Sequence, residues 1–550
     1  MTTDNQSRVV LSVEGVTIDT RPAGRKPIVR DISFDVKEGE TVCVVGESGS
    51  GKSVTSMAVM GLLPKDALQV SKGRILLDGE DVLQVSAARM RALRAAGVAM
   101  VFQEPMTALN PVKTVGEQID EVLRLHTKDS AAQRRKKVLE MMERVHLPDV
   151  TRIYKAFPHE LSGGQRQRIV IAMALILRPR LLLADEPTTA LDVTTQKQIL
   201  HLIKELQEQE KTAVVFVTHD FGVVSEIADR IVVMNRGELV ETGTRDEILT
   251  APKQDYTRML VSSVPSLIPR RSPVTGQPKV LEVVGLVKRY GKKGLISDHS
   301  VLAAQEVSFT VHKGEITGII GESGSGKSTV ARCVMRLTDP SQGAVVVNGQ
   351  DIVPMRRLRD VRKQVQYIFQ DPYRSLNPRR TIGQSLMEGL INYGIDEGEA
   401  RRRAGETLEL VNMPASVMNR YPHQFSGGQR QRIAIARAVV MKPDLLIADE
   451  AVSALDVTVQ AQVLRLLEDI RANTGVSILF ITHDLRVAAQ ICNTVVVMQK
   501  GRIVEQGAAG DVLANPRHDY TRALIDAAPA PDWDFQNFRP AAGMPGMAPA

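Results

Sequence analysis

The segment GESGSGKS occupies residues 46–53, and the same eight letters return at residues 321–328. Both copies match G-x-x-x-x-G-K-[ST], a pattern for which a chain of this length gives roughly 0.02 chance matches. A strand that ends in such a loop and runs into a helix directs backbone N–H groups and the positive end of the helix toward a phosphate. We therefore expect two phosphate-binding loops, and not two glycine-rich turns with an exposed lysine.

Each residue type in this loop has a physical task. Glycines permit the tight cradle, the lysine reaches the β- and γ-phosphates of a nucleotide, and the serine that follows can ligate Mg²⁺. The residues expected to bind the nucleotide are Gly46, Ser48, Gly49, Gly51, Lys52, Ser53 and Val54 in the first loop and Gly321, Ser323, Gly324, Gly326, Lys327, Ser328 and Thr329 in the second. Ser53 and Ser328 are also expected metal ligands.

Matching segments return in the same order in both halves of the chain. They are VFQEPMTALNP and IFQDPYRSLNP (from 101 and 368), LSGGQRQRI and FSGGQRQRI (from 161 and 425), LLLADE and LLIADE (from 181 and 445), VTHD and ITHD (from 217 and 481), and DYTR twice (from 255 and 519). The offset between the copies falls from 275 at the loops to 267 at the FQ pair, and then stays at 264. The chain is thus a duplicated domain and not a short-period solenoid.

The repeats also set the expected domain boundaries, which are 9–263 for the first domain and 280–528 for the second. Residues 264–279 contain four prolines and no apolar periodicity, which indicates an extended, semi-stiff linker. Residues 529–550 contain five prolines among alanine and glycine, so we expect a disordered tail.

The apolar periodicity predicts the fold class. Alternation ahead of the first loop, as at Leu11 and Val13, predicts an antiparallel sheet. The apolar runs at 42–45 and 181–184 lack alternation, as buried parallel strands do. Between the FQEP and SGGQ segments the period becomes that of helices. We therefore expect an α/β core with a helical insertion in each copy.

Acidic residues follow the apolar runs of LLLADE and LLIADE, so they should emerge at the carboxyl end of a core strand, where α/β sheets bind ligands. A carboxylate that aligns a water molecule is sufficient for phosphoryl transfer, which needs mainly positioning and charge stabilisation. We expect Mg²⁺ at Asp185 and Asp449, water positioning by Glu186 and Glu450, and contact with the γ-phosphate by His219 and His483. For the two histidines, a satisfied core position is the alternative.

The apolar runs, the first residues and the cysteines of the sequence argue against several classes of protein. The longest uninterrupted apolar run, from Ile169 to Leu177, has nine residues, less than half of what a membrane-spanning helix needs. The first residues, MTTDNQSR, have no basic region followed by an apolar one, so a cytosolic location is expected. The cysteines are far apart and form no C-x-x-C, so we expect small buried hydrophobic residues at Cys43, Cys333 and Cys492.

The net charge of +7 suits nucleic acid, an anionic membrane surface or a phosphate ligand. The basic clusters RRKK at 134–137 and RRR at 401–403 lie in polar segments with helical spacing. Solvated helix faces are the favoured interpretation of both clusters.

Taken in order, the P-loop, the Q-loop glutamine, LSGGQ, the acidic pair, the ALD turn and the histidine resemble the nucleotide-binding domain of ABC ATPases, and the match covers nearly the whole chain twice. The resemblance implies two P-loop NTPase domains, each with an antiparallel β subdomain, a RecA-like core and a helical subdomain. It implies ATP and Mg²⁺ as cofactors and ATP hydrolysis coupled to transmembrane transport. It also adds the Q-loop residues Gln103 and Gln370 to the catalytic residues and metal ligands.

ABC domains bind ATP between two copies, so that each nucleotide touches the P-loop of one copy and the LSGGQ signature of the other. By this resemblance the signature residues expected to contact nucleotide are Ser162, Gly163, Gly164 and Gln165, and Ser426, Gly427, Gly428 and Gln429. Fusion of the copies would make this dimer intramolecular, at an effective concentration on the order of millimolar. The family usually places an aromatic residue under adenine, and that position holds Tyr290 in the second copy but Thr20 in the first.

The ALNP and SLNP segments and the DYT segments resemble the oligopeptide and dipeptide importer branch. This implies a peripheral subunit at the cytoplasmic face of the inner membrane that energises import of peptides or related small polar solutes. Its partners would be two membrane-spanning permease subunits and a periplasmic or extracellular solute-binding protein.

The alternative is a soluble tandem ABC ATPase that acts on ribosomes or nucleic acid. Such relatives carry a long charged helical segment between the copies or zinc cysteines, and this sequence has neither, so no nucleic-acid partner is expected.

The sequence departs from the family pattern in two further ways. Pro187 of the first copy is replaced by Ala451 in the second, which frees a backbone N–H but leaves the carboxylates. Many longer peptide-importer subunits carry a cysteine cluster for iron–sulfur in a C-terminal extension, and this sequence has no such cluster. Both copies keep the lysine, glutamine, aspartate, glutamate and histidine, so both composite sites are expected to hydrolyse ATP.

Overall fold

The computed structural model of the protein describes residues 8–21, 26–103, 108–188, 191–291, 300–453, 455–531 and 533–540. Within them the chain forms two compact units, and the main division falls between Val264 and Pro265. The two units repeat the same order of elements, as the duplicated sequence predicts.

Each unit begins with a four-stranded antiparallel sheet, in the order β2-β1-β4-β5 in the first unit and β12-β11-β14-β15 in the second. The strands are β1 (Val9–Thr20), β2 (Pro27–Lys37), β4 (Leu68–Leu77), β5 (Glu80–Asp81), β11 (Lys279–Tyr290), β12 (Val301–His312), β14 (Gln342–Val347) and β15 (Gln350–Asp351). Leu11 and Val13 of β1 are buried, because alternate residues of a strand point to the same face. The predicted antiparallel sheet is confirmed.

The second sheet of each unit has six strands, in the order β10-β9-β3-β8-β7-β6 and β16-β17-β18-β13-β19-β20. Its strands are β3 (Thr41–Val45), β6 (Val98–Val101), β7 (Leu181–Asp185), β8 (Ala213–Thr218), β9 (Arg230–Asn235), β10 (Glu238–Thr244), β13 (Ile316–Ile320), β16 (Val365–Ile368), β17 (Leu445–Asp449), β18 (Ser477–Thr482), β19 (Thr494–Gln499) and β20 (Arg502–Ala508). Every residue of β3, β7 and β8 is buried, and these strands are parallel, as predicted. Their carboxyl ends therefore lie side by side.

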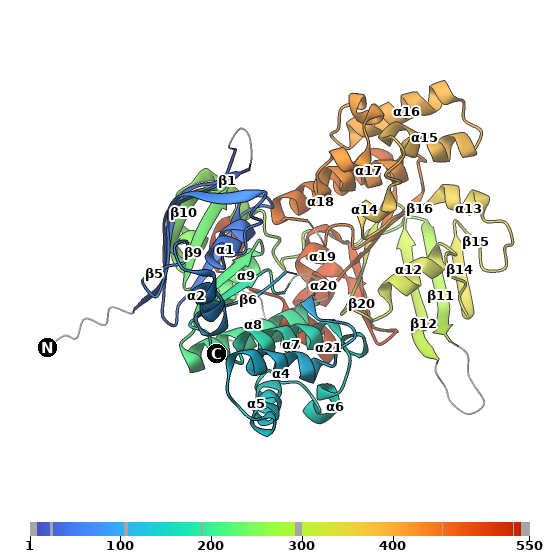
Figure 1. The fold of residues 1–550 in the computed structure, drawn as a ribbon. Coiled ribbons are helices and arrows are strands. Elements are labelled where there is room, and N and C mark those ends of the chain that lie inside the picture. Colours follow the sequence, from blue (N-terminus) through green and yellow to red (C-terminus); the bar gives the residue numbers. More distant parts are fainter. Residues whose placement is uncertain are drawn as a thin grey trace. The chain divides into compact units, whose positions relative to one another are not determined.

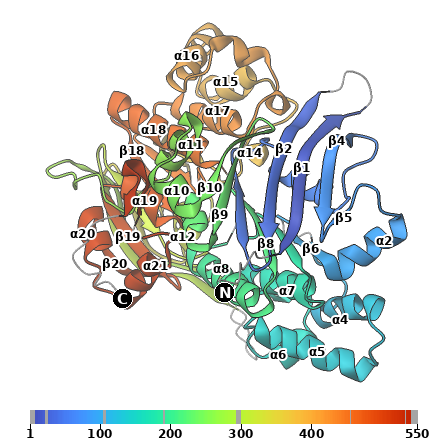
Figure 2. The same cartoon turned by 90° about the vertical axis from the view of Figure 1, so that its left-hand side faces the viewer.

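A helical subdomain is inserted between the Q-loop and the LSGGQ segment, as the helical period predicts. Its helices are α4 (Val115–His126), α5 (Ala131–Arg144), α6 (Val150–Tyr154) and α7 (Gly163–Leu175), and in the second unit α15 (Ile382–Asn392), α16 (Glu397–Leu410) and α17 (Gly427–Val439), with 3-10 turns at Pro158–Glu160, Ala415–Asn419 and Pro422–Gln424. Figures 1 and 2 show α4, α5 and α6 grouped beside α7, and α15 and α16 grouped beside α17.

The remaining helices of the first unit are α1 (Lys52–Val59), α2 (Ala87–Ala92) with a π-helical turn (Leu93–Gly97), α8 (Val193–Glu210), α9 (Phe221–Ile227), α10 (Arg245–Thr250) and α11 (Asp255–Ser262). Those of the second are α12 (Lys327–Val334), α13 (Arg359–Gln364), α14 (Pro372–Ser375), α18 (Val457–Thr474), α19 (Leu485–Ile491), α20 (Ala509–Ala514) and α21 (Asp519–Ala527). Within the described part of the chain, no helix has the length and apolar character needed to cross a bilayer.

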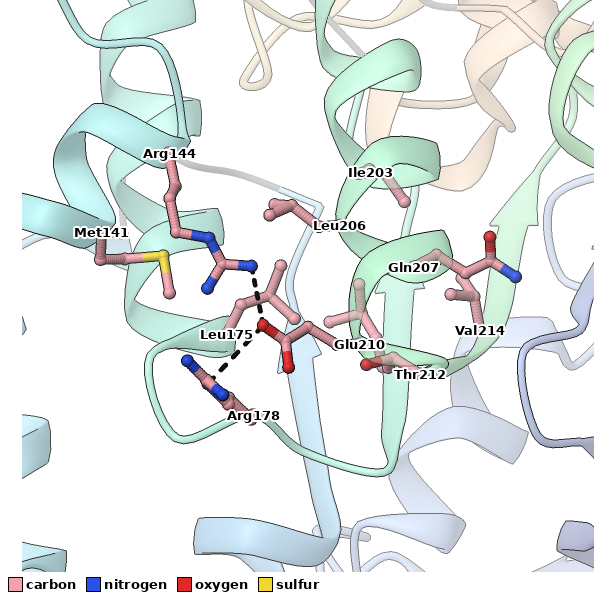
Figure 3. Close-up of a pocket in the computed structure, with 11 residues that line it drawn as sticks. Met141, Arg144, Leu175, Arg178, Ile203, Leu206, Gln207, Glu210, Thr212 and Val214 are labelled. Carbon is pink, nitrogen blue, oxygen red and sulfur yellow. Dashed lines mark hydrogen bonds and ion pairs between the residues drawn. The ribbon is translucent and has the colours of Figure 1, made fainter.

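Where the helical subdomain of the first unit meets the core, an ion-pair cluster closes a small pocket. Arg144 Nη2 lies 2.8 Å from Glu210 Oε1, and Arg178 Nε lies 3.6 Å from the same oxygen. Figure 3 shows both guanidinium groups directed toward Glu210. The equivalent position at the end of α18 is Thr474, which has no charge, so the carboxylate at the centre of this cluster has no counterpart there.

The two basic clusters lie on α5 and α16, and nearby carboxylates pair with them. The ion pairs are Arg134 with Asp120, Lys137 with Asp129, and Arg402 and Arg403 with Glu399. Arg135, Lys136, Lys137, Arg401 and Arg402 are exposed, which agrees with the interpretation of the clusters as solvated helix faces.

The expected linker, residues 264–279, is held by side chains of the second unit. Arg271 Nη2 lies 2.5 Å from Glu468 Oε1, and Asn493 Nδ2 donates a hydrogen bond of 2.7 Å to the carbonyl of Ser272. The segment up to Pro278 forms neither helix nor strand, as its prolines predict.

The tail was expected to be disordered from residue 529, and this is wrong for residues 533–540. There β21 (Trp533–Asp534) pairs with β22 (Arg539–Pro540) across a 3-10 turn (Phe535–Asn537). Phe535 is buried and stacks on Trp533 with ring centroids 5.9 Å apart. The two aromatic rings supply apolar surface that can be buried, and a prediction from the proline content alone does not take this surface into account. Residues 541–550 lie outside the described part of the chain.

All three cysteines are buried free thiols, as expected. Cys43 and Cys492 lie on opposite sides of one contact between a strand and a helix end, and each unit has a cysteine on only one of these two sides. Cys43 lies at the middle of β3, where β13 has Gly318, and Cys492 ends α19, where the chain after α9 has Ala228. A Cβ on Gly318 would lie 2.7 Å from the Cys492 sulfur. Each unit therefore accommodates one thiol at this contact between strand and helix end.

We predict that Gly318→Cys destabilises the second unit by about 1–3 kcal/mol, because the added side chain overpacks the contact with Cys492. The double variant Gly318→Cys with Cys492→Ala reproduces the pair found in the first unit and should regain most of the loss. Denaturant unfolding of the two variants and the wild type measures both effects. A double variant as unstable as the single one would contradict this explanation.

Candidate active site

The phosphate-binding loop of each unit begins at a glycine that no other residue can replace. Gly46 and Gly321 have φ of 151° and 146°. A Cβ on Gly46 would overlap the carbonyl oxygen of Met234 on the neighbouring strand β9, and a Cβ on Gly321 would overlap that of Met498 on β19. The loop is thus fixed against the sheet before it turns into the helix.

The loop lysine lies inside the curve of the loop. Lys52 Nζ donates hydrogen bonds of 2.7 and 2.9 Å to the carbonyls of Gly46 and Glu47, and Lys327 makes the equivalent bonds at 2.8 and 2.8 Å. Burial lowers the pKa of Lys327, and the carboxylates of Glu450 and Asp449 act in the opposite direction. A buried ammonium group at the start of a helix offers charge and donors to an anion. Val54 and Thr329 belong to the first turn of α1 and α12.

A hydroxyl and a carboxylate meet next to each loop. Ser53 Oγ donates to Asp185 Oδ1 at 3.1 Å, and Ser328 Oγ donates to Asp449 Oδ1 at 3.0 Å. Burial raises the pKa of both aspartates, and the serine hydrogen bonds oppose this shift. Hard oxygen donors of this kind fit Mg²⁺, which takes one or two protein oxygens together with phosphate oxygens and water. The serine and the aspartate predicted to hold the metal therefore lie together in both units, whereas the predicted ligands Gln103 and Gln370 contact Glu186 and Glu450 instead.

The following glutamate lies between the glutamine and the histidine. Gln103 Nε2 donates to Glu186 Oε2 at 2.8 Å, and His219 Nδ1 lies 3.0 Å from Glu186 Oε1. In the second unit the corresponding distances to the Glu450 carboxylate are 2.7 Å from Gln370 and 3.4 Å from His483. Three segments that are far apart in the sequence thus converge on one carboxylate in each unit.

Both glutamates have left-handed backbone conformations, with φ of 46° at Glu186 and 48° at Glu450. Non-glycine residues rarely adopt this region, and it costs of order 1–3 kcal/mol. The N–H of each glutamate donates to a carbonyl of the neighbouring strand at 2.9 Å, which holds the turn. Strain of this kind is typical of functional sites.

The signature residues form the first turn of a helix in each unit. Ser162 caps α7 by accepting from the N–H of Gln165 at 3.3 Å, and Ser426 caps α17 by accepting from the N–H of Gln429 at 3.4 Å. A Cβ on Gly164 would lie 2.5 Å from the Thr195 methyl group. The predicted signature positions, which include Gly163, Gly427 and Gly428, thus lie at the positive ends of α7 and α17.

The tyrosine of the repeated DYTR segment has a contact that the sequence pattern did not predict. The N–H of Glu47 donates to Tyr256 Oη at 3.4 Å, and the N–H of Glu322 donates to Tyr520 Oη at 3.1 Å. Burial raises the pKa of Tyr520 to about 12. The repetition of DYTR at the same offset was the available signal, and the structure places its tyrosine against the phosphate-binding loop in both units.

Tyr290 and Thr20 are both the last residue of the first strand in their units, β11 and β1. Tyr290 is 39% exposed, and the Lys288 ammonium lies 5.0 Å from its ring centroid. A half-exposed ring at a strand end can stack on a flat ligand. Stacking of Tyr290 on adenine stays a prediction.

We predict that the pKa of His483 lies above 6.5. Burial lowers it, but the hydrogen bond and charge of Glu450 together with the charge of Asp484 raise it, and the net shift is upward. The contribution to stability is therefore complete below pH 6.5 and is lost as the pH rises through the folded-state pKa. Glu450→Gln should lower the pKa of His483, as measured by NMR titration of the ring protons, while His219 in the other unit serves as the reference. An unchanged pKa of His483 in this variant would contradict the pairing.

Known proteins share this sequence and arrangement. The ABC transporter family model matches residues 29–189 and 304–453, and the oligopeptide/dipeptide transporter C-terminal region matches residues 240–285 and 504–547. The chain is 46% identical to the glutathione import ATP-binding protein GsiA of Salmonella choleraesuis (strain SC-B67), over 96% of this chain and 90% of the relative. It is 46% identical to GsiA of Escherichia coli (strain K12), over 94% of this chain and 89% of the relative.

A solved structure of the ATP-binding cassette MJ0796 bound to ADP and Pi matches 43% of this chain and 98% of its own, at 31% identity and a TM-score of 0.39. The family model matches more than half of the chain, and the curated relatives are similar over nearly all of it. Two copies of the oligopeptide/dipeptide region accompany the two ATPase domains. The chain therefore belongs to the ABC transporter ATP-binding proteins and has two ATP-hydrolysing domains, each with the C-terminal region of the oligopeptide/dipeptide branch.

Proposed function

We propose that this chain supplies the energy for import of glutathione or a related small peptide. The observation that carries the proposal is the repeated convergence of the loop lysine, the serine–aspartate pair and the glutamate held by glutamine and histidine. Such a set suits hydrolysis of a nucleoside triphosphate. The curated relatives, which are similar over nearly the whole chain, are glutathione import ATP-binding proteins.

In the first unit we assign a separate role in ATP hydrolysis to each of the predicted site residues. Loop N–H groups and Lys52 would hold the phosphates, and Ser53 with Asp185 would hold Mg²⁺, which would supply positive charge against the charge of the phosphates. Glu186 orients the attacking water and accepts its proton, while His219 keeps the carboxylate in place. Lys327, Ser328, Asp449, Glu450 and His483 do the same in the second unit. Gln103 and Gln370 remain proposed metal ligands in addition to their contacts with the glutamates.

The proposed assembly contains two membrane-spanning permease subunits and a periplasmic or extracellular solute-binding protein, with this chain on the cytoplasmic face. The signature of each domain would complete the nucleotide site of the other. A helix N-terminus with a serine hydroxyl, as at Ser162 and Ser426, suits the far side of a γ-phosphate. Fusion of the domains would raise the effective concentration of one domain at the other.

Action on ribosomes or nucleic acid is the weaker alternative. The curated relatives carry import names, and the oligopeptide/dipeptide region occurs after both domains. The basic clusters that could bind nucleic acid form ion pairs with carboxylates of their own subdomains.

We predict that both sites hydrolyse ATP. Glu186→Gln and Glu450→Gln should each slow hydrolysis by about 100-fold at the altered site, because the amide cannot accept the proton of the attacking water. Single-turnover ATPase assays on each variant measure the effect. Glu208→Gln, on an exposed position of α8, is the matched control and should behave as wild type. If Glu450→Gln also behaves as wild type, the second site is degenerate.

Deletion of the gene that encodes this chain, in the organism it comes from, tests the import function. Uptake of radiolabelled glutathione and of a labelled dipeptide is measured, and uptake of whichever solute this chain helps to import should fall to background. The wild-type chain should restore uptake, and the double variant Glu186→Gln with Glu450→Gln should not. Uptake of glutathione and of small peptides that is unaffected by the deletion would overturn the proposal.

A further inference from the structure

A tyrosine hydroxyl contacts the predicted metal ligand of the second unit. Tyr367 Oη donates a hydrogen bond of 2.6 Å to Asp449 Oδ2, and Ser328 Oγ donates to the other oxygen, Oδ1, at 3.0 Å. Tyr367 is 7% exposed and lies on β16, which is parallel to β17. Because Tyr367 is opposite Ile447, its side chain reaches the carboxylate two residues further along β17. Both oxygens of Asp449 therefore have a hydroxyl donor.

The first unit has no hydroxyl at the same position. Met100 on β6 is opposite Leu183 on β7, which is two residues before Asp185, so its place in the sheet matches that of Tyr367. A thioether has no proton to donate. Ser53 Oγ donates a hydrogen bond to Asp185 Oδ1, as Ser328 does to Asp449. The strand next to the aspartate thus supplies a donor in one unit and an apolar side chain in the other.

A second hydrogen bond changes what the aspartate can do. A carboxylate held at one oxygen can rotate about its Cβ–Cγ bond, whereas one held at both oxygens has its plane fixed. The outer lone pair of each oxygen remains for a cation or for a water bound to it. Partners of metal ligands act in this way, and their loss typically costs 10- to 100-fold in metal affinity or activity.

We propose that Tyr367 is a positioning residue that fixes the Asp449 carboxylate, so that the second unit binds its divalent cation more tightly than the first. The inference rests on the proposed function, because it assumes that Asp185 and Asp449 hold the cation that accompanies ATP. The Tyr367 hydrogen bond would thus give the two otherwise matched sites different affinities for the metal.

The ring of Tyr367 also packs on Phe369, with centroids 4.7 Å apart. Tyr367→Phe keeps this packing and removes only the hydroxyl, so it separates positioning from packing. Tyr393→Phe is the matched control, because the Tyr393 hydroxyl donates to the carbonyl of Arg359 and its ring lies against the Arg359 guanidinium group. Met100→Tyr introduces the hydroxyl in the first unit.

The test is a Mn²⁺ titration of the full chain followed by electron paramagnetic resonance, with a non-hydrolysable ATP analogue present. The wild type should show two classes of Mn²⁺ that differ in affinity. Tyr367→Phe should weaken the tighter class by about 10-fold, whereas Tyr393→Phe should not change it. Met100→Tyr should tighten the weaker class. Binding of the analogue in excess EDTA should be the same in all four proteins.

The inference is overturned if Tyr367→Phe leaves both Mn²⁺ classes unchanged or tightens the second one. Equal weakening in Tyr393→Phe would overturn it as well, because the effect would then be structural. If the wild type shows no nucleotide-dependent Mn²⁺ binding, the proposed function fails, and this inference fails with it.

Discussion

The site in each unit depends on the contact between the first glycine of the phosphate-binding loop and a main-chain carbonyl of the neighbouring strand. Gly46 and Gly321 leave no room there for a Cβ, so the loop starts at a fixed height above the sheet. Because β3, β7 and β8 are parallel, the loop, the acidic pair and the histidine all emerge at the same edge. The side chains then meet without long connecting segments.

The chemistry of the site could be predicted from the sequence because its residues sit in repeated segments at fixed offsets. Periodicity likewise predicted the buried strands and the helical insertion, since both follow from which face of an element is apolar. Composition failed at residues 533–540, where Trp533 and Phe535 order a segment that its prolines suggest is disordered. Tyr367 could not be found, because the two copies differ at that position and a tyrosine in a buried strand is usually part of the core.

At the predicted catalytic groups the two units agree in two pairs of distances and differ by 0.4 Å in the third, between histidine and glutamate (3.0 and 3.4 Å), and they also differ in the residues behind these groups. The serine–aspartate and glutamine–glutamate distances are within 0.1 Å of each other in the two units. The differences are at Met100 and Tyr367, at Cys43 and Gly318, and at Glu210 and Thr474. Reacting groups must satisfy one geometry set by the phosphate and the cation, whereas supporting positions need only fill volume or satisfy a local charge. Divergence at supporting positions can therefore change the affinity of a site while its chemistry remains the same.

The turn after the aspartate of each acidic pair shows whether the sequence or the fold causes its unusual backbone conformation. Pro187 follows Glu186 in the first unit, and a proline restricts the residue before it. In the second unit Ala451 removes that restriction, yet Glu450 has φ of 48° against 46° for Glu186, and the same N–H to carbonyl distance of 2.9 Å to the neighbouring strand. The proline is thus not the cause of the strained conformation. What the two copies share at this turn is the hydrogen bond from the glutamate N–H to the neighbouring strand, and the glutamine and histidine beside the carboxylate, so these contacts are consistent with the conformation in both.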